Sequence, residues 1–173
     1  AHVLAMAVQT LFPETKVTIG PWTETGFYYD FDRPTPFIPE DLKKLQKEMR
    51  RIIRANLPVI REVVDRDTIR AEIKVLQEPY KQEILDGIPA DAPITRYFIG
   101  SPDTGTTSHP EVEPSLIDPV AVPPSRVWWD LCAGPHLDST RAIHPKAFAL
   151  ESVAGAYWRG DETRPQLQRI YGT

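Results

Sequence analysis

Cysteine is nearly absent from this sequence, which has one thiol, Cys132, in 173 residues. No disulfide can form within the chain, so we expect a reducing compartment such as the cytoplasm. Long apolar runs are lacking as well. Because no eighteen consecutive residues are apolar, the sequence predicts no helical membrane span, and we expect no signal peptide.

Positive charge is also too scarce for a protein that wraps nucleic acid. Lys and Arg number 20 against 24 Asp and Glu, which gives a net charge of −4 and a pI of about 5.6. Binding along many phosphates requires clustered Lys and Arg, so the sequence predicts at most a short nucleic-acid end held in one local pocket. The hydrophobic fraction of 41% is enough for the core of one domain.

The chain starts at Ala1 and stops abruptly at Thr173, so we expect a single domain, residues 1–173, cut from a larger protein. Residues 101–125 hold six prolines and neither Lys nor Arg. Such a composition cannot build a packed core. Strand-like sequence resumes directly afterwards, so we interpret this stretch as a loop insertion and not as a linker between domains.

Hydrophobic periodicity predicts helices and strands without a regular βαβ alternation. The clearest helix covers residues 39–56, where apolar residues recur at helical spacing from Leu42 to Ile53. This mixture indicates the α+β class. The remaining predicted helices are 2–12, 66–75 and 79–87, and the predicted strands are 16–20, 26–32, 57–64, 94–99, 127–131, 147–153, 155–159 and 167–171.

The side chains able to carry chemistry gather first in one short segment. Asp130, Cys132 and His136 follow an aromatic strand, and Gly134 and Pro135 between them predict a shaped turn. Cysteine and histidine four residues apart can face one site. By itself, however, such a pair is more often structural than functional.

Other candidates are scattered along the chain. His2 and Met6 lie one turn apart on the first predicted helix and therefore share a face. Lys81 opens a short helix, where a lysine is usually solvated. Tyr29 and Asp30 belong to an aromatic strand whose simplest interpretation is core packing with one outward charge. Each of these patterns is ordinary when taken alone.

Three of the candidates carry the donor atoms of a zinc site. His2, Cys132 and His136 supply two nitrogens and one sulfur, and a catalytic zinc needs three protein ligands and one open position. A closed structural site needs a fourth ligand, for which Met6 is poorly suited because a neutral thioether prefers softer ions. Zinc is therefore one alternative, although the pattern requires no cofactor.

Five segments in this order resemble one family closely: HVLAMAVQTLFP, KVTIGPWTETGFYYDFD, EPYKQEILDG, WWDLCAGPH and GAYWRGDETRPQLQRIYGT. They are similar to the second N-terminal domain, the editing domain, of bacterial-type threonyl-tRNA synthetases, most of all to cyanobacterial and plastid members. The resemblance covers nearly the whole chain except about residues 101–125. It implies the α+β fold shared with the editing domain of alanyl-tRNA synthetases, a mixed or antiparallel sheet with packed helices.

The family carries an HxxxH pattern on its first helix and a CxxxH pattern later. His2, Cys132 and His136 match three of these positions, whereas Met6 replaces the second histidine of the first pair. The replacement removes one proton carrier or ligand. It bears on both a four-ligand metal site and a mechanism that uses both histidines of the first helix.

The activity that the resemblance implies is hydrolysis of the ester between serine and the terminal adenosine of threonine tRNA. A synthetic site for threonine discriminates poorly against serine, because one missing methylene is worth about 1–3 kcal/mol, and a second site removes the error. The implied catalytic residues are His2 and His136, which position or deprotonate water, and Lys81, which stabilises negative charge or holds the adenosine. The implied substrate-binding residues are Asp130, Cys132, Tyr29 and Met6.

Two other interpretations stay open. In the first, zinc held by His2, Cys132 and His136 occupies or regulates the site, since the alanyl relatives use the comparable set for zinc while the threonyl site works without metal. In the second, Met6 has abolished hydrolysis and the domain only positions tRNA. The implied partners are the acceptor end of threonine tRNA and the other domains of a homodimeric synthetase, with no membrane.

Overall fold

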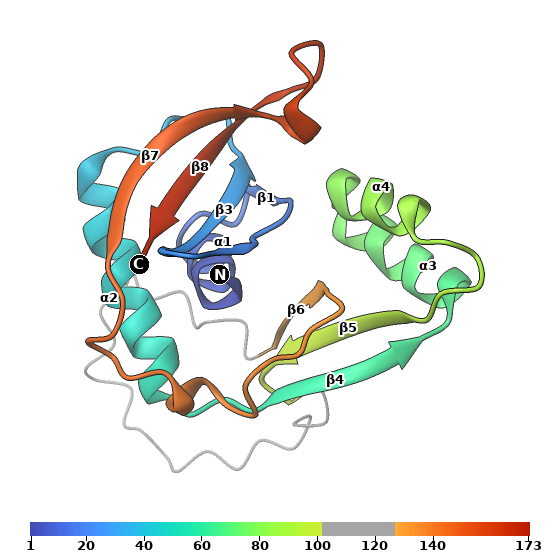
Figure 1. Cartoon of the computed structure of the whole chain (residues 1–173), viewed down its shortest axis with the longest axis horizontal. Helices are drawn as coiled ribbons and strands as arrows, with labels where there is room; N and C mark the ends of the chain where they lie inside the picture. The colour runs from blue at the N-terminus through green and yellow to red at the C-terminus, as the bar shows by residue number, and fades with distance from the viewer. Residues whose placement is uncertain (102–126) are drawn as a thin grey trace, which may run out of the picture.

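The computed structural model describes residues 1–101 and 127–173, so the insertion predicted at 101–125 lies outside the described residues apart from its first position. No helix in this part of the chain is long and apolar enough to cross a membrane. Figure 1 shows the arrangement of the elements. They are α1 (His2–Leu11), β1 (Lys16–Val17), β2 (Trp22–Thr23), β3 (Gly26–Asp32), α2 (Pro39–Arg54), β4 (Val59–Val64), α3 (Arg66–Leu76), α4 (Pro79–Gly87), β5 (Ile94–Ile99), β6 (Trp128–Leu131), η2 (Thr140–Ala142), β7 (Leu150–Tyr157), η3 (Trp158–Gly160) and β8 (Gln166–Gly172).

Two sheets form the framework. The larger has the order β1-β3-β8-β7 with β2 also paired to β3, and the smaller has the order β4-β5-β6. Every strand pair in the described residues is antiparallel, which confirms the α+β class. The strands predicted separately at 147–153 and 155–159 are in fact one strand, β7. Ala154 and Gly155 continue its pairing with β8, so no turn interrupts it.

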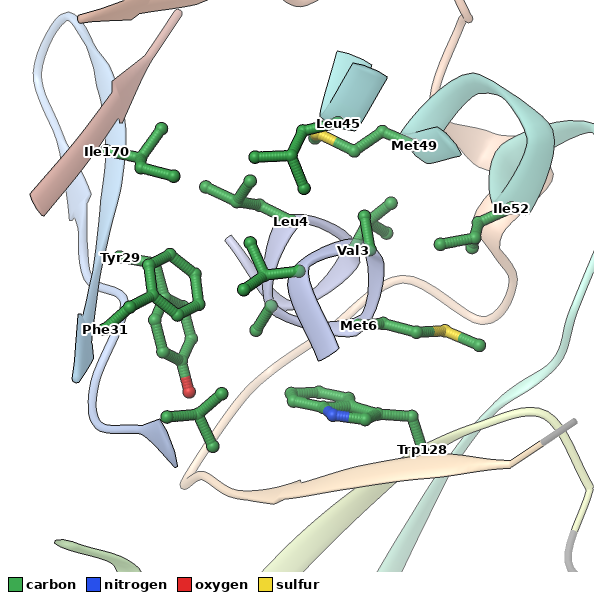
Figure 2. Close-up of a cluster of buried hydrophobic side chains, with 14 of the residues drawn as sticks. Val3, Leu4, Met6, Tyr29, Phe31, Leu45, Met49, Ile52, Trp128 and Ile170 are labelled. Carbon is green, nitrogen blue, oxygen red and sulfur yellow. The ribbon is translucent and has the colours of Figure 1, made fainter. Parts of the chain in front are cut away.

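Helix α1 lies at the centre of the main core. All of its residues from Val3 to Val8 are buried, as expected for a helix that is apolar on every side. Figure 2 shows the helix enclosed by side chains from both sheets and from α2. Those drawn around it are Tyr29 and Phe31 of β3, Leu45, Met49 and Ile52 of α2, Trp128 of β6 and Ile170 of β8.

Helices α3 and α4 form a second layer on the smaller sheet (Figure 1). Ile69 and Ile73 of α3 pack with Leu85 of α4 and Ile94 of β5 in a separate apolar cluster. Asp65 caps α3, because its carboxylate accepts hydrogen bonds from the backbone N–H groups of the helix's first turn. The first turn of α4 carries Lys81, which contacts Asp130 and the backbone of Trp129 on β6.

The first turn of α4 is tied to the larger sheet and to α1. Tyr80 packs edge-on against Trp158 and donates a hydrogen bond of 2.6 Å to Asp32. Glu78, just before the helix, accepts a hydrogen bond of 2.7 Å from the side chain of Gln9 on α1. These contacts hold the next residue of α4, the lysine discussed below, against β6.

The expectation of an outward charge on β3 is wrong. Asp30 is 4% exposed, and Arg169 binds its two carboxylate oxygens through Nε at 2.7 Å and Nη2 at 2.9 Å. The two residues are direct partners in the β3–β8 register. The charge of Asp30 is therefore neutralised within the sheet. The sequence pattern could not predict this, because the partner, Arg169, lies 139 residues away in the chain.

Candidate functional site

A cavity of about 600 Å³ opens beside the first turn of α1. This is the size of a small-molecule site. Its walls come from α1, the segment before β3, α2, the smaller sheet and the loop that follows β6, and most of them are apolar. His2, Cys132 and His136 supply polar atoms to the wall, so the chemistry of the cavity is concentrated on these three side chains.

The structure brings His2 at the start of the chain together with Cys132 and His136, more than 120 residues later. The rings of His2 and His136 meet edge to face with centroids 4.6 Å apart. Nε2 of His136 lies 3.2 Å from Sγ of Cys132, which is hydrogen-bond distance for sulfur. One ligand atom of each residue lies within 4.8 Å of the others. The grouping predicted from the sequence is thus present in space.

The loop after β6 has the shape that the sequence predicts, and Gly134 makes that shape accessible. Its φ is +71°, and a Cβ at this position would lie 1.9 Å from the hydroxyl of Tyr97. The backbone N–H of Gly134 donates to Sγ of Cys132 at 3.4 Å. Tyr97 also packs edge-on against His136 with centroids 4.2 Å apart. Glycine is therefore needed here on two counts, backbone conformation and space.

Behind His2 lies a buried carboxylate, that of Asp130. It accepts hydrogen bonds from Tyr29 Oη at 2.6 Å and Lys81 Nζ at 2.8 Å, and it lies 3.5 Å from Nε2 of His2. Lys81 also donates to the backbone carbonyl of Trp129 at 3.1 Å. These contacts form a polar layer that supports His2 from the core side.

The placement of Lys81 differs from what the sequence predicts. A lysine at a helix start is usually solvated, yet Lys81 is 2% exposed and its ammonium pairs with Asp130. Neither residue lines the cavity, and neither do Tyr29 and Met6. Met6 is 1% exposed and lies in the main core (Figure 2). Contact of these four with substrate, as the family resemblance implies, is not what the geometry favours.

Burial controls the protonation of the site. It lowers the pKa of His2 to about 4, although the charge of Asp130 acts in the opposite direction. Burial also lowers the pKa of His136 and raises that of the Cys132 thiol. Burial by itself would raise the pKa of Asp130, but Lys81, His2 and the hydrogen bonds together hold it below its usual value. At neutral pH the site therefore presents two neutral imidazoles, a thiol and a carboxylate.

Two parts of the cavity were not found from the sequence. Tyr97 lies on β5, whose residues are all buried, and nothing in its pattern separates a wall residue from a core residue. Trp22 also lines the cavity and is largely exposed. Tyr97 and Trp22 could not be predicted as cavity residues, because that depends on which elements pack around the cavity, and the sequence pattern does not show this.

The donor set suits a zinc ion. In a tetrahedral site the Zn–N and Zn–S distances are about 2.0–2.3 Å, which places the ligand atoms roughly 3.5 Å apart. His2, Cys132 and His136 are within 4.8 Å of one another, so small side-chain rotations would complete the geometry. Met6 is buried in the main core and does not line the cavity. The residues therefore fit a site with three protein ligands and an open position.

Comparison with known proteins places this geometry in a family. The family described as "Threonyl and Alanyl tRNA synthetase second additional domain" matches residues 97–171. Over all 173 residues the chain is 57% identical to the threonine–tRNA ligase of Gloeobacter violaceus and 55% identical to that of Synechococcus elongatus. It is 54% identical to "Threonine--tRNA ligase, chloroplastic/mitochondrial 2" of Arabidopsis thaliana.

The chain spans 22–24% of the length of these curated relatives. The match extends from the first residue to the last, so it includes the segments that carry His2, Lys81, Cys132 and His136. Residues 97–171 thus belong to the family of the threonyl and alanyl tRNA synthetase second additional domain, and the whole chain is similar to one part of the threonine–tRNA ligases of cyanobacteria and plants.

Proposed function

We propose that this chain is an editing domain that hydrolyses the ester of serine wrongly attached to threonine tRNA, releasing serine and free tRNA. The observation that carries the proposal is the pair of neutral imidazoles, His2 and His136, that meet at the wall of a mainly apolar cavity. A neutral imidazole has a free nitrogen lone pair, which can accept a proton from water. Membership in a tRNA synthetase domain family supports the substrate class.

In this proposal water held between the two histidines gives a proton to an imidazole and attacks the ester carbonyl. The C–O bond to the ribose then breaks, and the same proton passes to the departing ribose oxygen. Asp130 acts on His2 from behind, at 3.5 Å, and stabilises the positive charge that develops when His2 takes the proton. A base oriented by a carboxylate on its far side is a recurrent arrangement in hydrolases. The low pKa of His2 makes it a weak base, so holding the water in place contributes as much as proton transfer.

Lys81 is a positioning residue in this scheme. Its ammonium is buried at 2.8 Å from Asp130 and cannot extend to a substrate that occupies the cavity. It neutralises Asp130 and fixes the direction in which that carboxylate faces His2. Tyr29 does the same through its hydroxyl at 2.6 Å. We therefore propose that Lys81 and Tyr29 orient His2. The family resemblance had implied that they contact the substrate directly.

Cys132 lines the cavity between the two histidines and the loop backbone, and we assign to it contact with the amino-acid side chain. Its thiol stays protonated at neutral pH, because burial raises its pKa. A thiol is a poor nucleophile compared with a thiolate. Covalent catalysis by Cys132 is therefore not part of the proposal, and the apolar walls hold the nucleoside.

The direct test is deacylation by the 173-residue chain of seryl- and threonyl-tRNA prepared with the same threonine tRNA. We expect seryl-tRNA to be lost much faster than in buffer and much faster than threonyl-tRNA. His136→Ala removes a catalytic imidazole, and general base catalysis contributes about 10²–10⁴-fold. Loss of seryl-tRNA at the buffer rate would refute the hydrolase and leave the interpretation of a module that only positions tRNA.

Zinc binding is the second candidate, favoured by the three ligand atoms within 4.8 Å of one another. A zinc ion would supply a Lewis acid at the position where the ester carbonyl lies. His2, Cys132 and His136 would hold it. Zinc measured in the purified chain at one equivalent, and lost in Cys132→Ala, would support this candidate. Full deacylation by a chain without zinc would show that hydrolysis needs no metal.

The remaining proposals concern the whole synthetase. We propose that the domain acts on the acceptor end of threonine tRNA and that the other domains supply most of the tRNA affinity, because the chain itself has a net charge of −4. The full-length enzyme is proposed to be a homodimer in the cytoplasm or plastid stroma. Deacylation by the isolated chain should accordingly show a high KM that falls in the full-length enzyme.

A further inference from the structure

An exposed tryptophan lies at the lip of the cavity. Trp22 is 82% exposed and yet contributes to the cavity wall, together with Pro21 and Phe27 from the same segment. Trp128 and Trp158, by contrast, are 7% and 2% exposed. Exposing a tryptophan ring to water costs free energy, because the ring is large and mainly apolar, and binding of a ligand to the ring removes that cost. Its position beside the site suggests that the covering group belongs to the ligand.

The backbone that carries Trp22 is held in place. Trp22 pairs with Phe27 in the short β2–β3 hairpin. On the other side, the Tyr28 N–H donates to the carbonyl of Pro21 at 3.2 Å, and the Asp30 N–H donates to that of Ile19 at 3.1 Å. The backbone beneath the indole is thus fixed, while the ring itself remains largely exposed. A preorganised aromatic surface loses little entropy when it binds a flat group.

The chemistry of the proposed substrate identifies that flat group. If the seryl ester lies at His2 and His136, the nucleotides attached to it leave through the mouth of the cavity, where Trp22 lies. Unpaired bases have two apolar faces, and stacking on an aromatic side chain is a general way to bind them. A chain with a net charge of −4 is poorly suited to binding through many phosphates, so stacking on Trp22 would be a useful source of affinity outside the cavity.

We propose that Trp22 stacks on an unpaired base at the 3′ end of the acceptor strand, either the terminal adenine or the base that precedes it. The inference rests on the proposed function for the substrate and adds a binding residue outside the reacting groups. Trp22 sets affinity and leaves the hydrolytic step to the histidines. Its loss is therefore expected in Kd and KM and not in kcat.

The test uses two probes that cannot be hydrolysed, in which an amide replaces the seryl ester: a minihelix with an intact single-stranded 3′ end, and adenosine alone. Binding of both to the 173-residue chain is measured for Trp22→Ala and Trp22→Phe. Tyr157→Ala is the control, since Tyr157 is an aromatic residue that is 44% exposed on β7 and does not line the cavity. Values of kcat and KM for a seryl minihelix ester are measured in parallel.

We expect Trp22→Ala to raise the Kd of the minihelix by about 5- to 100-fold, the loss of one stacked base. Trp22→Phe should recover much of this loss, and Tyr157→Ala should bind as the original chain does. An equal loss with the adenosine probe assigns the stacking to the terminal adenine, and a loss confined to the minihelix assigns it to the preceding base. Both outcomes support the proposal.

Unchanged minihelix binding in Trp22→Ala, or a fall in kcat at constant Kd, would overturn the proposal. Failure of the original chain to bind the minihelix would overturn it too. These results are separate from failure of the proposed function. If the chain binds the minihelix in a Trp22-dependent way but hydrolyses no ester, the stacking proposal holds and the proposed hydrolase activity is refuted. If the chain hydrolyses the ester equally well with and without Trp22, the hydrolase holds and the stacking proposal is refuted.

Discussion

Replacing Lys81 by methionine tests the polar layer behind the candidate site. The substitution keeps a long side chain in the space but removes the ammonium that lies 2.8 Å from the Asp130 carboxylate. Both side chains are almost fully buried, with exposed fractions of 2% and 4%. Asp130 would keep its hydrogen bonds from Tyr29 and from the Leu131 N–H, yet its charge would no longer be neutralised.

The expected cost is about 3–5 kcal/mol of unfolding free energy, the usual result of removing one member of a buried ion pair. For a chain of 173 residues this corresponds to a fall in Tm of roughly 6–20 °C, at about 2–4 °C per kcal/mol. Asp130→Asn should cost a similar amount, because it leaves the Lys81 ammonium unpaired. The double variant should lose less than the sum of the two, since no lone charge remains.

The assay is urea unfolding at neutral pH of the original chain, the two single variants and the double variant. Lys47→Met is the matched control, because Lys47 is an exposed lysine on helix α2. We expect the control to change the unfolding free energy by less than about 0.5 kcal/mol. A loss in Lys81→Met no larger than in Lys47→Met, or strict additivity in the double variant, would refute the buried pair as described.

Three further predictions concern the site itself. Gly134→Ala should lower the Tm by several degrees and abolish deacylation, because its Cβ would lie 1.9 Å from Tyr97 Oη at a φ of +71°; a circular dichroism melt close to that of the original chain would contradict this. Because the pKa of His2 is about 4 in the folded state and 6.5 in the unfolded state, the unfolded chain binds this proton first. Stability should therefore fall as the pH drops from 6.5 towards 4, by up to about 3 kcal/mol, and urea midpoints for His2→Gln should show a flatter slope over that range. Cys132→Ala should keep deacylation within about tenfold of the original rate, while His136→Ala should lose about 10²-fold or more. Equal losses would contradict the assignment of Cys132 to substrate contact alone.

The helices illustrate what a sequence pattern can predict. The repeat from Leu42 to Ile53 predicted a helix over 39–56, and α2 covers Pro39–Arg54. It ends two residues early because Asn56 adopts a positive φ and Pro58 follows. The fold class and most strands followed in the same way, since burial of one face imposes a period that is visible in the residues themselves.

The site was predicted in part. His2, Cys132 and His136 were identified by residue type, by spacing and by the family resemblance, and the structure brings them to one wall of a cavity. The environment of Lys81 was not predictable, because its partner lies 49 residues away on another element. Periodicity within α4 predicts which face of the helix is apolar, but it cannot predict that the carboxylate of Asp130 packs against that face.

By itself the sequence determined the class of fold and most of the elements, because these follow from local residue types and their spacing. It also predicted His2, Cys132 and His136 as candidate site residues, but only when the family resemblance was added to their residue types and spacing. The tertiary structure alone decided that Lys81 and Asp130 support His2 from the core, that Asp30 is neutralised by Arg169, and that Trp22 remains exposed at the cavity mouth. The reason is that desolvation and pairing of a charge or ring depend on atoms from distant segments. No pattern along the chain measures their approach.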